Sequence, residues 1–208
     1  MNPNPLQKID STLDFLYEEL SWAYLFYFTA KALNQANQRG KMLFRNYLFA
    51  SAYKATLNEA VLVLSKLVIS DKDSISFEYL FNLIDQASDL FPHASKATVQ
   101  SALNQHRNQL NSHQPLISQI ISQRDKRLAH ADRDLINQPE KMAAEPMILM
   151  DEVERCLKDL LAILSTYNNY LRQADYGLSV IQENAQRDVD YVVSIYAQGQ
   201  TGVKNIKL

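Results

Sequence analysis

The segment LQKIDSTLDFLYEELSWAYLFYFTAKALNQANQ, residues 6–38, decides the fold. Its apolar side chains recur every three or four residues, which places them on one face of an α-helix. They are Leu13, Leu16, Tyr17, Leu20, Tyr24 and Phe28. Neither glycine nor proline interrupts the segment before Gly40, so the pattern predicts one long helix over about 6–38.

The same helical period continues through the rest of the chain. We expect helices between Gly40 and Asp71, from Ser76 to Pro92, from Ser95 to His113, from Pro115 to about 132, and over about 148–174 and 178–198. Ser76 and Ser95 are the predicted N-caps, and 133–146 is a predicted loop. The sequence therefore predicts an all-α fold, an up-and-down bundle of six to seven helices. We expect a single domain over 1–208, with about 199–208 as a flexible tail.

Composition excludes several classes of protein. The 208 residues include 4 glycines, too few for sandwiches, barrels or glycine-rich phosphate loops. The net charge of -2 gives no general attraction for nucleic acid, so RNA binding would need a local site. The single cysteine, Cys156, forms no intramolecular disulfide, and we expect it to be a core thiol. We also expect neither a signal peptide nor a membrane span, which favours a cytoplasmic protein.

The stretch QRDKRLAHAD at 123–132 carries the candidate chemistry. On an ideal helix of roughly 100° per residue, Arg124 lies within about 60° of Ile117, Ile121 and Leu128. A guanidinium on an apolar face needs a partner, because burying an unpaired charge is costly. The partner could be a carboxylate inside the bundle, a second subunit, or an anion bound in a cavity.

His130 lies about 120° from Arg124 on the same ideal helix, so the two side chains would not meet within one chain. Arg127 is the nearer neighbour of His130, three residues before it. Across a twofold axis, however, the Arg124 of one chain can approach the His130 of the other.

Arg124, Asp125 and His130, with five residues between the arginine and the histidine, resemble the signature of the HEPN superfamily (higher eukaryotes and prokaryotes nucleotide-binding). The turn with Lys66, Leu67 and Asp71, followed by a helix that opens SFEYLF, is similar to the abortive-infection branch of that superfamily. The resemblance covers about 40–200 and implies a HEPN-like helical bundle.

The resemblance implies a metal-independent endoribonuclease that acts as a homodimer and leaves 2′,3′-cyclic phosphate ends. His130 would be the general acid and base, and Arg124 would stabilise the phosphate in the transition state. Asp125 would orient the pair, and Lys126 or Arg127 would contact flanking phosphates. The implied partners are RNA, a second copy of the chain, and an antitoxin or another defence protein. The implied role is that of a toxin in antiviral abortive infection, without a cofactor or metal.

Two other interpretations stay open at this point. A non-catalytic HEPN module would bind nucleotide or RNA, or a protein partner, without turnover. A plain helical interaction protein would pair Arg124 internally.

The remaining candidates have structural interpretations. We expect His106 to face water, because glutamines and asparagines surround it, and His93 and His113 to face solvent or cap helix ends. The aromatic cluster Trp22, Tyr24, Phe26, Tyr27 and Phe28 predicts a buried helix, with a dimer interface or an RNA-stacking surface as the alternative.

Overall fold

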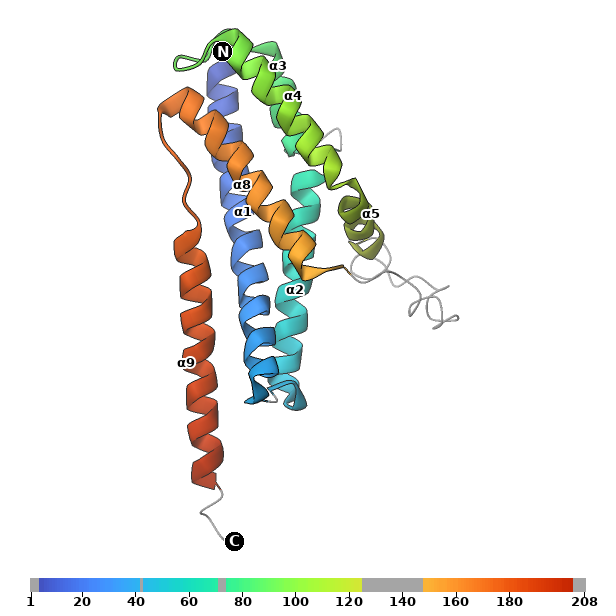
Figure 1. The fold of residues 1–208 in the computed structure, drawn as a ribbon, viewed down its shortest axis with the longest axis vertical. Coiled ribbons are helices and arrows are strands. Elements are labelled where there is room, and N and C mark those ends of the chain that lie inside the picture. Colours follow the sequence, from blue (N-terminus) through green and yellow to red (C-terminus); the bar gives the residue numbers. More distant parts are fainter. Residues whose placement is uncertain (1–3, 42, 71–73, 125–147, 204–208) are drawn as a thin grey trace. The chain divides into compact units, whose positions relative to one another are not determined.

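A computed structural model describes residues 4–41, 43–70, 74–124 and 148–203, and every regular element in these ranges is a helix (Figure 1). The elements are α1 (Pro5–Ala36), a π-helical turn η1 (Asn37–Lys41), a 3₁₀ turn η2 (Leu43–Arg45), α2 (Tyr47–Val68), α3 (Phe77–Gln86), α4 (Lys96–Ser112), α5 (Gln114–Gln123), α8 (Met150–Arg172) and α9 (Ser179–Val203). The all-α prediction is confirmed, with seven α-helices in the described ranges.

Two predicted helix starts are confirmed by their caps. The Ser76 hydroxyl accepts a hydrogen bond from the Tyr79 backbone N–H at 3.4 Å, and the Ser95 hydroxyl accepts one from Thr98 N–H at 3.2 Å. Each bond satisfies a backbone donor that the first helical turn leaves without a partner.

The predicted end of α3 at Pro92 is wrong, because the helix already ends at Gln86. Polar side chains compete for the backbone there: the Ser88 hydroxyl donates to the Asp85 carbonyl at 3.4 Å. Gln100 of α4 in turn donates to the Ser88 hydroxyl at 2.9 Å. Such local side-chain bonds favour a turn over a continued helix.

The chain divides into two compact units, and each is described separately. Unit 1 comprises Met1–Ala23 and Val61–Tyr176. In it, α4 packs against α3, α5 and α8. Fully buried side chains fill its core, among them Leu13, Leu16 and Leu20 of α1, Phe77 and Phe81 of α3, and Leu160, Leu164 and Tyr167 of α8.

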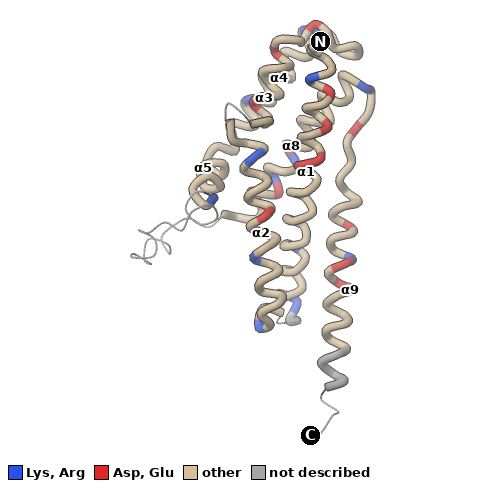
Figure 2. The backbone as a smooth tube through the Cα atoms, turned by 180° about the vertical axis from the view of Figure 1, so that it is seen from behind, with Lys and Arg blue, Asp and Glu red and all other residues tan. Residues whose placement is uncertain are grey.

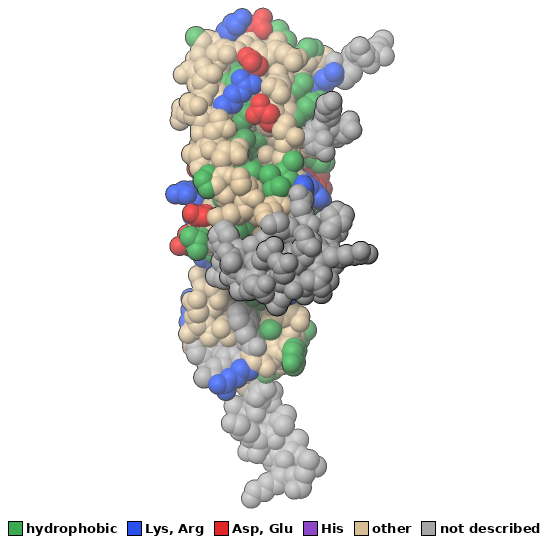
Figure 3. Space-filling view, turned by 90° about the vertical axis from the view of Figure 1, so that its right-hand side faces the viewer, with side chains coloured by type: hydrophobic (Ala, Val, Ile, Leu, Met, Phe, Trp, Pro, Cys, Tyr) green, Lys and Arg blue, Asp and Glu red, His purple; other side chains and the backbone are tan. Residues whose placement is uncertain are grey.

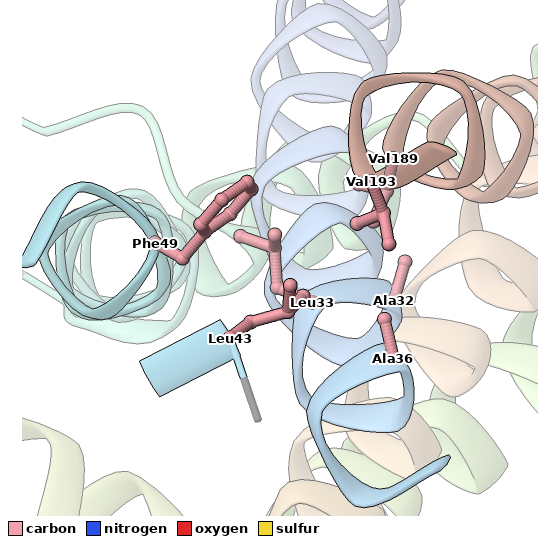
Figure 4. Packing of buried hydrophobic residues seen from close by; sticks show 7 residues of the cluster. All are labelled: Ala32, Leu33, Ala36, Leu43, Phe49, Val189 and Val193. Atoms are coloured by element: carbon pink, nitrogen blue, oxygen red, sulfur yellow. The ribbon is translucent and has the colours of Figure 1, made fainter. Parts of the chain in front are cut away.

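Unit 2 comprises Tyr24–Ala60 and Gly177–Leu208. Its core side chains come from α1, the η2 turn, α2 and α9 and converge as Figure 4 shows: Ala32, Leu33, Ala36, Leu43, Phe49, Val189 and Val193. The Phe49 and Tyr196 rings meet edge to face with 5.1 Å between centroids, and Asn46 donates to the Tyr196 hydroxyl at 3.2 Å. Two of the three unit boundaries, at 23/24 and 60/61, fall inside α1 and α2, and the third, at 176/177, lies between α8 and α9. The single domain stays a prediction.

Helix α9 is longer than predicted and runs to Val203, past the expected end near 198. The glycines at 199 and 202 suggested an earlier end. A glycine inside a helix costs only about 1 kcal/mol relative to alanine, however, and does not by itself stop one.

The aromatic cluster of α1 separates into buried and exposed members. Tyr24, Tyr27 and Phe28 are buried, which confirms the core interpretation for these three. The centroid of the Phe28 ring lies 5.4 Å from that of Tyr24 and 5.1 Å from that of Tyr27. Trp22 is about half exposed, and Phe26 is half-buried. None of the described helices has the length and apolarity that crossing a bilayer requires.

Candidate functional site

Helix α5 places Arg124 at the end of its buried stripe. Leu116, Ile117 and Ile120 are buried, which confirms the apolar face that the sequence predicts for this part of the helix. Arg124 follows the last residue of α5 with helical backbone angles, φ −57° and ψ −51°, and its N–H donates to the carbonyls of Ile120 and Ile121. Its side chain is half-buried. The arginine therefore continues the geometry of a helix whose face belongs to the core.

The other predicted site residues, Asp125, Lys126, Arg127 and His130, lie outside the described residues, in 125–147. Arg124 is the predicted site residue that the described ranges include. The convergence of Arg124 and His130 therefore stays a prediction.

His113 lies where α4 ends and α5 begins, and the expectation that its side chain faces solvent is wrong. The ring is buried, and its Nε2 lies 2.7 Å from Oδ2 of Asp159 on α8. The capping alternative is confirmed through the backbone: His113 is the C-cap of α4, and its N–H donates to the Leu110 carbonyl at 3.1 Å. The ring makes no capping bond at the start of α5. Since the Ile117 N–H donates to the His113 carbonyl, this residue joins the first turn of α5 to α8.

The prediction that His106 faces water is also wrong. The ring is buried, with Nδ1 3.0 Å from the hydroxyl of Tyr167. Burial lowers the pKa of His106 below its ordinary value and raises the pKa of Tyr167, so both groups are neutral near pH 7. A signal was present in the sequence: Val99, Leu103 and Leu110 share the helical spacing of His106, and all four side chains are buried.

An arginine cluster that the sequence analysis missed joins α1 to α8 inside unit 1. The Arg172 guanidinium donates to Asp10 at 2.6 Å and to both carboxylate oxygens of Asp14 at 2.7 and 2.9 Å. The Tyr176 hydroxyl also donates to Asp14, and its ring stacks on Tyr17 with centroids 4.0 Å apart. The hydrogen bonds from Arg172 hold the pKa of Asp14 below its ordinary value. Such residues, distant in sequence, leave no local pattern that could have indicated the cluster.

Cys156 is buried, which confirms the prediction of a core thiol, and burial raises its pKa to about 12. A thiol of that pKa is neither a nucleophile nor a metal ligand at neutral pH. Within the described residues, no three histidine, cysteine, aspartate or glutamate side chains gather where they could hold a metal ion.

Charged side chains of both signs are mixed along the described helices. Acidic and basic positions are neighbours on α9 in Figure 2, and on the face drawn in Figure 3 lysine and arginine side chains lie beside aspartate and glutamate. This distribution fits the net charge of -2 and the expectation that RNA binding would need a local site.

In a comparison with protein families, the model of the family HEPN_AbiU2, described as AbiU2, matches residues 6–192. The match includes α5, Arg124 and the segment that carries His130. Searches of curated proteins and of solved structures give no significant match.

Proposed function

The chain belongs to the AbiU2 family, an abortive-infection-associated family of the HEPN superfamily, and we propose that it is a metal-independent endoribonuclease acting as a homodimer. RNA is the proposed substrate. The proposed role is that of a toxin that cleaves RNA during phage infection, with an antitoxin or another defence protein as its regulator.

The observation that carries the proposal is the position of Arg124. It follows a helix whose apolar residues are buried, and it precedes His130 by six residues in a chain of this family. An arginine held by a rigid helix suits a phosphate, because the guanidinium is always charged and binds two phosphate oxygens at once. In a ribonuclease it would stabilise the charge that builds on those oxygens in the transition state.

We assign His130 as the general acid and base. Attack of the ribose 2′-OH on the adjacent phosphorus requires a base that works near neutral pH, and histidine is the side chain with that range. The 2′-OH loses its proton, the P–O5′ bond breaks, and the leaving oxygen takes up a proton. The products are a 2′,3′-cyclic phosphate and a 5′-hydroxyl. Asp125 would orient the pair, and Lys126 or Arg127 would contact flanking phosphates.

Helix α5 has the support that a phosphate-binding residue needs. Its stripe packs into unit 1, and its first turn is joined to α8 through the pair of His113 with Asp159. Side chains on firmly packed helices hold reacting groups more accurately than side chains on free loops.

The direct test is cleavage of RNA in EDTA. We expect the wild type to produce cyclic phosphate and 5′-hydroxyl ends. His130→Ala should lose about 10²-fold or more of the rate, and Arg124→Ala a similar factor. The matched control is His93→Ala, because His93 is an exposed histidine of the same chain. A wild type that binds RNA without cutting it would support the non-catalytic alternative. A His130→Ala variant as fast as the wild type would refute the site.

The composite site has its own test. A dimer of two Arg124→Ala chains, or of two His130→Ala chains, has no intact Arg124–His130 pair. A mixed dimer keeps one, because the His130→Ala chain supplies Arg124 and the Arg124→Ala chain supplies His130. Mixing the two inactive variants should therefore raise cleavage about tenfold or more above either variant alone. If the mixture stays inactive although mixed dimers form, the two residues do not act across subunits.

A further inference from the structure

Unit 2 carries an apolar groove that its own helices leave uncovered. The groove has a volume of about 300 Å³ and lies over α1 between α2 and α9. We call it the α2–α9 groove and define it by Leu33, Leu48, Phe49, Ala52, Val189 and Val192. A volume of this size takes two or three aliphatic side chains of a partner.

Exposed apolar side chains extend the groove along both of its walls. Tyr47 and Leu48 of α2 are 91% and 71% exposed, Tyr191 of α9 is 66% exposed, and Val192 and Ile195 are each 51% exposed. On α9 these residues are neighbours, since Val192 and Ile195 are three positions apart and Tyr191 and Ile195 four. Leu48 and Val192 both line the groove, so the exposed residues of the two helices adjoin it.

The helix of the proposed catalytic arginine offers no comparable surface in its described part. Leu116, Ile117 and Ile120 are buried within the protomer. The exposed residues of α5 are Gln114, Pro115 and Ser118. A dimer needs apolar area at its core, and the described part of α5 does not supply it.

We propose that a second copy of this chain covers the α2–α9 groove, in a twofold arrangement in which α9 of each copy packs against the groove of the other. This inference rests on the proposed function in one respect: the proposed composite site of Arg124 and His130 requires two copies of the chain. In a twofold contact one surface must be self-complementary. This surface offers both parts of such a contact. One part is the groove, and the other is the pair of exposed side chains Tyr191 and Ile195 on α9, the helix that forms one wall of the groove.

The apolar area matches what such a contact requires. From the full areas of such side chains, the exposed fractions of the five residues add up to roughly 500 Å² per copy. A standard interface buries about 800 Å² per partner, of which about 65% is apolar in homodimers, or roughly 520 Å². A patch of this size is also at the upper end of what a monomer ordinarily exposes.

The one charged residue in the lining does not oppose this contact. The carboxylate of Asp188 lies 3.4 Å from Nε of Arg187, so it already has a counter-ion when the groove is covered. A carboxylate without such a partner would make the contact costly.

The test is the mass of the full-length protein in solution, measured by light scattering and sedimentation without RNA. We expect a dimer for the wild type and a monomer for the double variant Leu48→Glu/Val192→Glu. The control is Ala197→Glu, which adds one such charge at an exposed position of α9 that lies at least about 120° from Tyr191, Val192 and Ile195 on an ideal helix. Its dimer should be unchanged, with a dissociation constant within about threefold of the wild type, whereas the double variant should weaken association by about 100-fold or more.

Circular dichroism shows whether each variant is folded, and the more conservative Leu48→Ser/Val192→Ser should weaken the dimer in the same direction. A monomeric wild type at tens of micromolar, or a folded double variant that stays dimeric, overturns the inference. The two proposals can fail separately. His130→Ala tests catalysis in a protein that should remain dimeric, whereas mass measurement tests the interface whether or not RNA is cut.

Discussion

Replacing Arg172 tests how strongly the arginine cluster joins α1 to α8. Arg172→Ala removes the hydrogen bonds to Asp10 and to both oxygens of Asp14. Arg172 is only 29% exposed, but the two carboxylates are 47% and 60% exposed, so solvent screens the pairs. Screened ion pairs contribute roughly 0–1 kcal/mol each, and bidentate geometry is at the strong end. We therefore expect a loss of about 2 kcal/mol in the free energy of unfolding.

The assay is thermal and urea unfolding followed by circular dichroism. A loss of about 2 kcal/mol corresponds to a melting temperature lowered by roughly 4–8 °C for a chain of this length. Arg187→Ala is the matched control. Its guanidinium meets Asp188 at 3.4 Å with both side chains 72% exposed, and we expect it to cost less than about 0.5 kcal/mol.

Acid provides a second test of the same cluster. The pKa of Asp14 is lowered from its ordinary 3.8, so the stabilising contribution is complete above that value and is lost as the pH falls below it. The stability difference between wild type and Arg172→Ala should therefore stay nearly constant from pH 7 to about pH 4 and be smaller at about pH 3. If Arg172→Ala costs no more than Arg187→Ala, or if the difference is the same at about pH 7 and about pH 3, the cluster does not stabilise the fold as argued.

Three further predictions concern unit 1. Burial lowers the pKa of His106 from 6.5, so the unfolded chain binds more protons than the folded one below that pH. The free energy of unfolding should therefore fall as the pH drops from about 7 to about 5. His106→Gln should flatten this pH dependence in urea titrations. His113→Ala removes the buried ring and leaves the carboxylate of Asp159, which is 29% exposed, without that partner. It should cost about 1–2 kcal/mol in the same assay and lower RNA cleavage, with His93→Ala unchanged. Ser76→Ala removes the cap of α3 and should cost about 1 kcal/mol, whereas Ser76→Asp should restore most of it.

The sequence was sufficient for the features that depend on local spacing. The stripe of α5 and the Ser76 and Ser95 caps follow from periods of three to four residues and from single capping side chains, and the structure confirms them. The spacing of His106 also places it on the buried stripe of α4. We expected it to face water because its neighbours in sequence are glutamines and asparagines. The buried partner Tyr167, 61 positions away, explains how a histidine fits that stripe.

Other features depend on residues that only the fold brings together. Arg172 meets Asp10 and Asp14 across 162 and 158 positions, and nothing near any of them in sequence indicates the contact. Beyond the early end of α3, Ser88 likewise accepts a hydrogen bond from Gln100 of α4, 12 positions away. For the site itself, the structure confirms the stripe that leads to Arg124, and the convergence with His130 stays a prediction.

Two arguments favour a second copy of the chain. The first comes from the sequence: on an ideal helix Arg124 and His130 would lie about 120° apart, so the proposed site would take its two residues from different chains. The second is an area: unit 2 exposes roughly 500 Å² of apolar side chains, close to the apolar part of one side of a homodimer interface. The angle concerns catalysis, and the area concerns association. A dimer built on the α2–α9 groove that cleaves RNA only when Arg124 and His130 come from different chains would satisfy both.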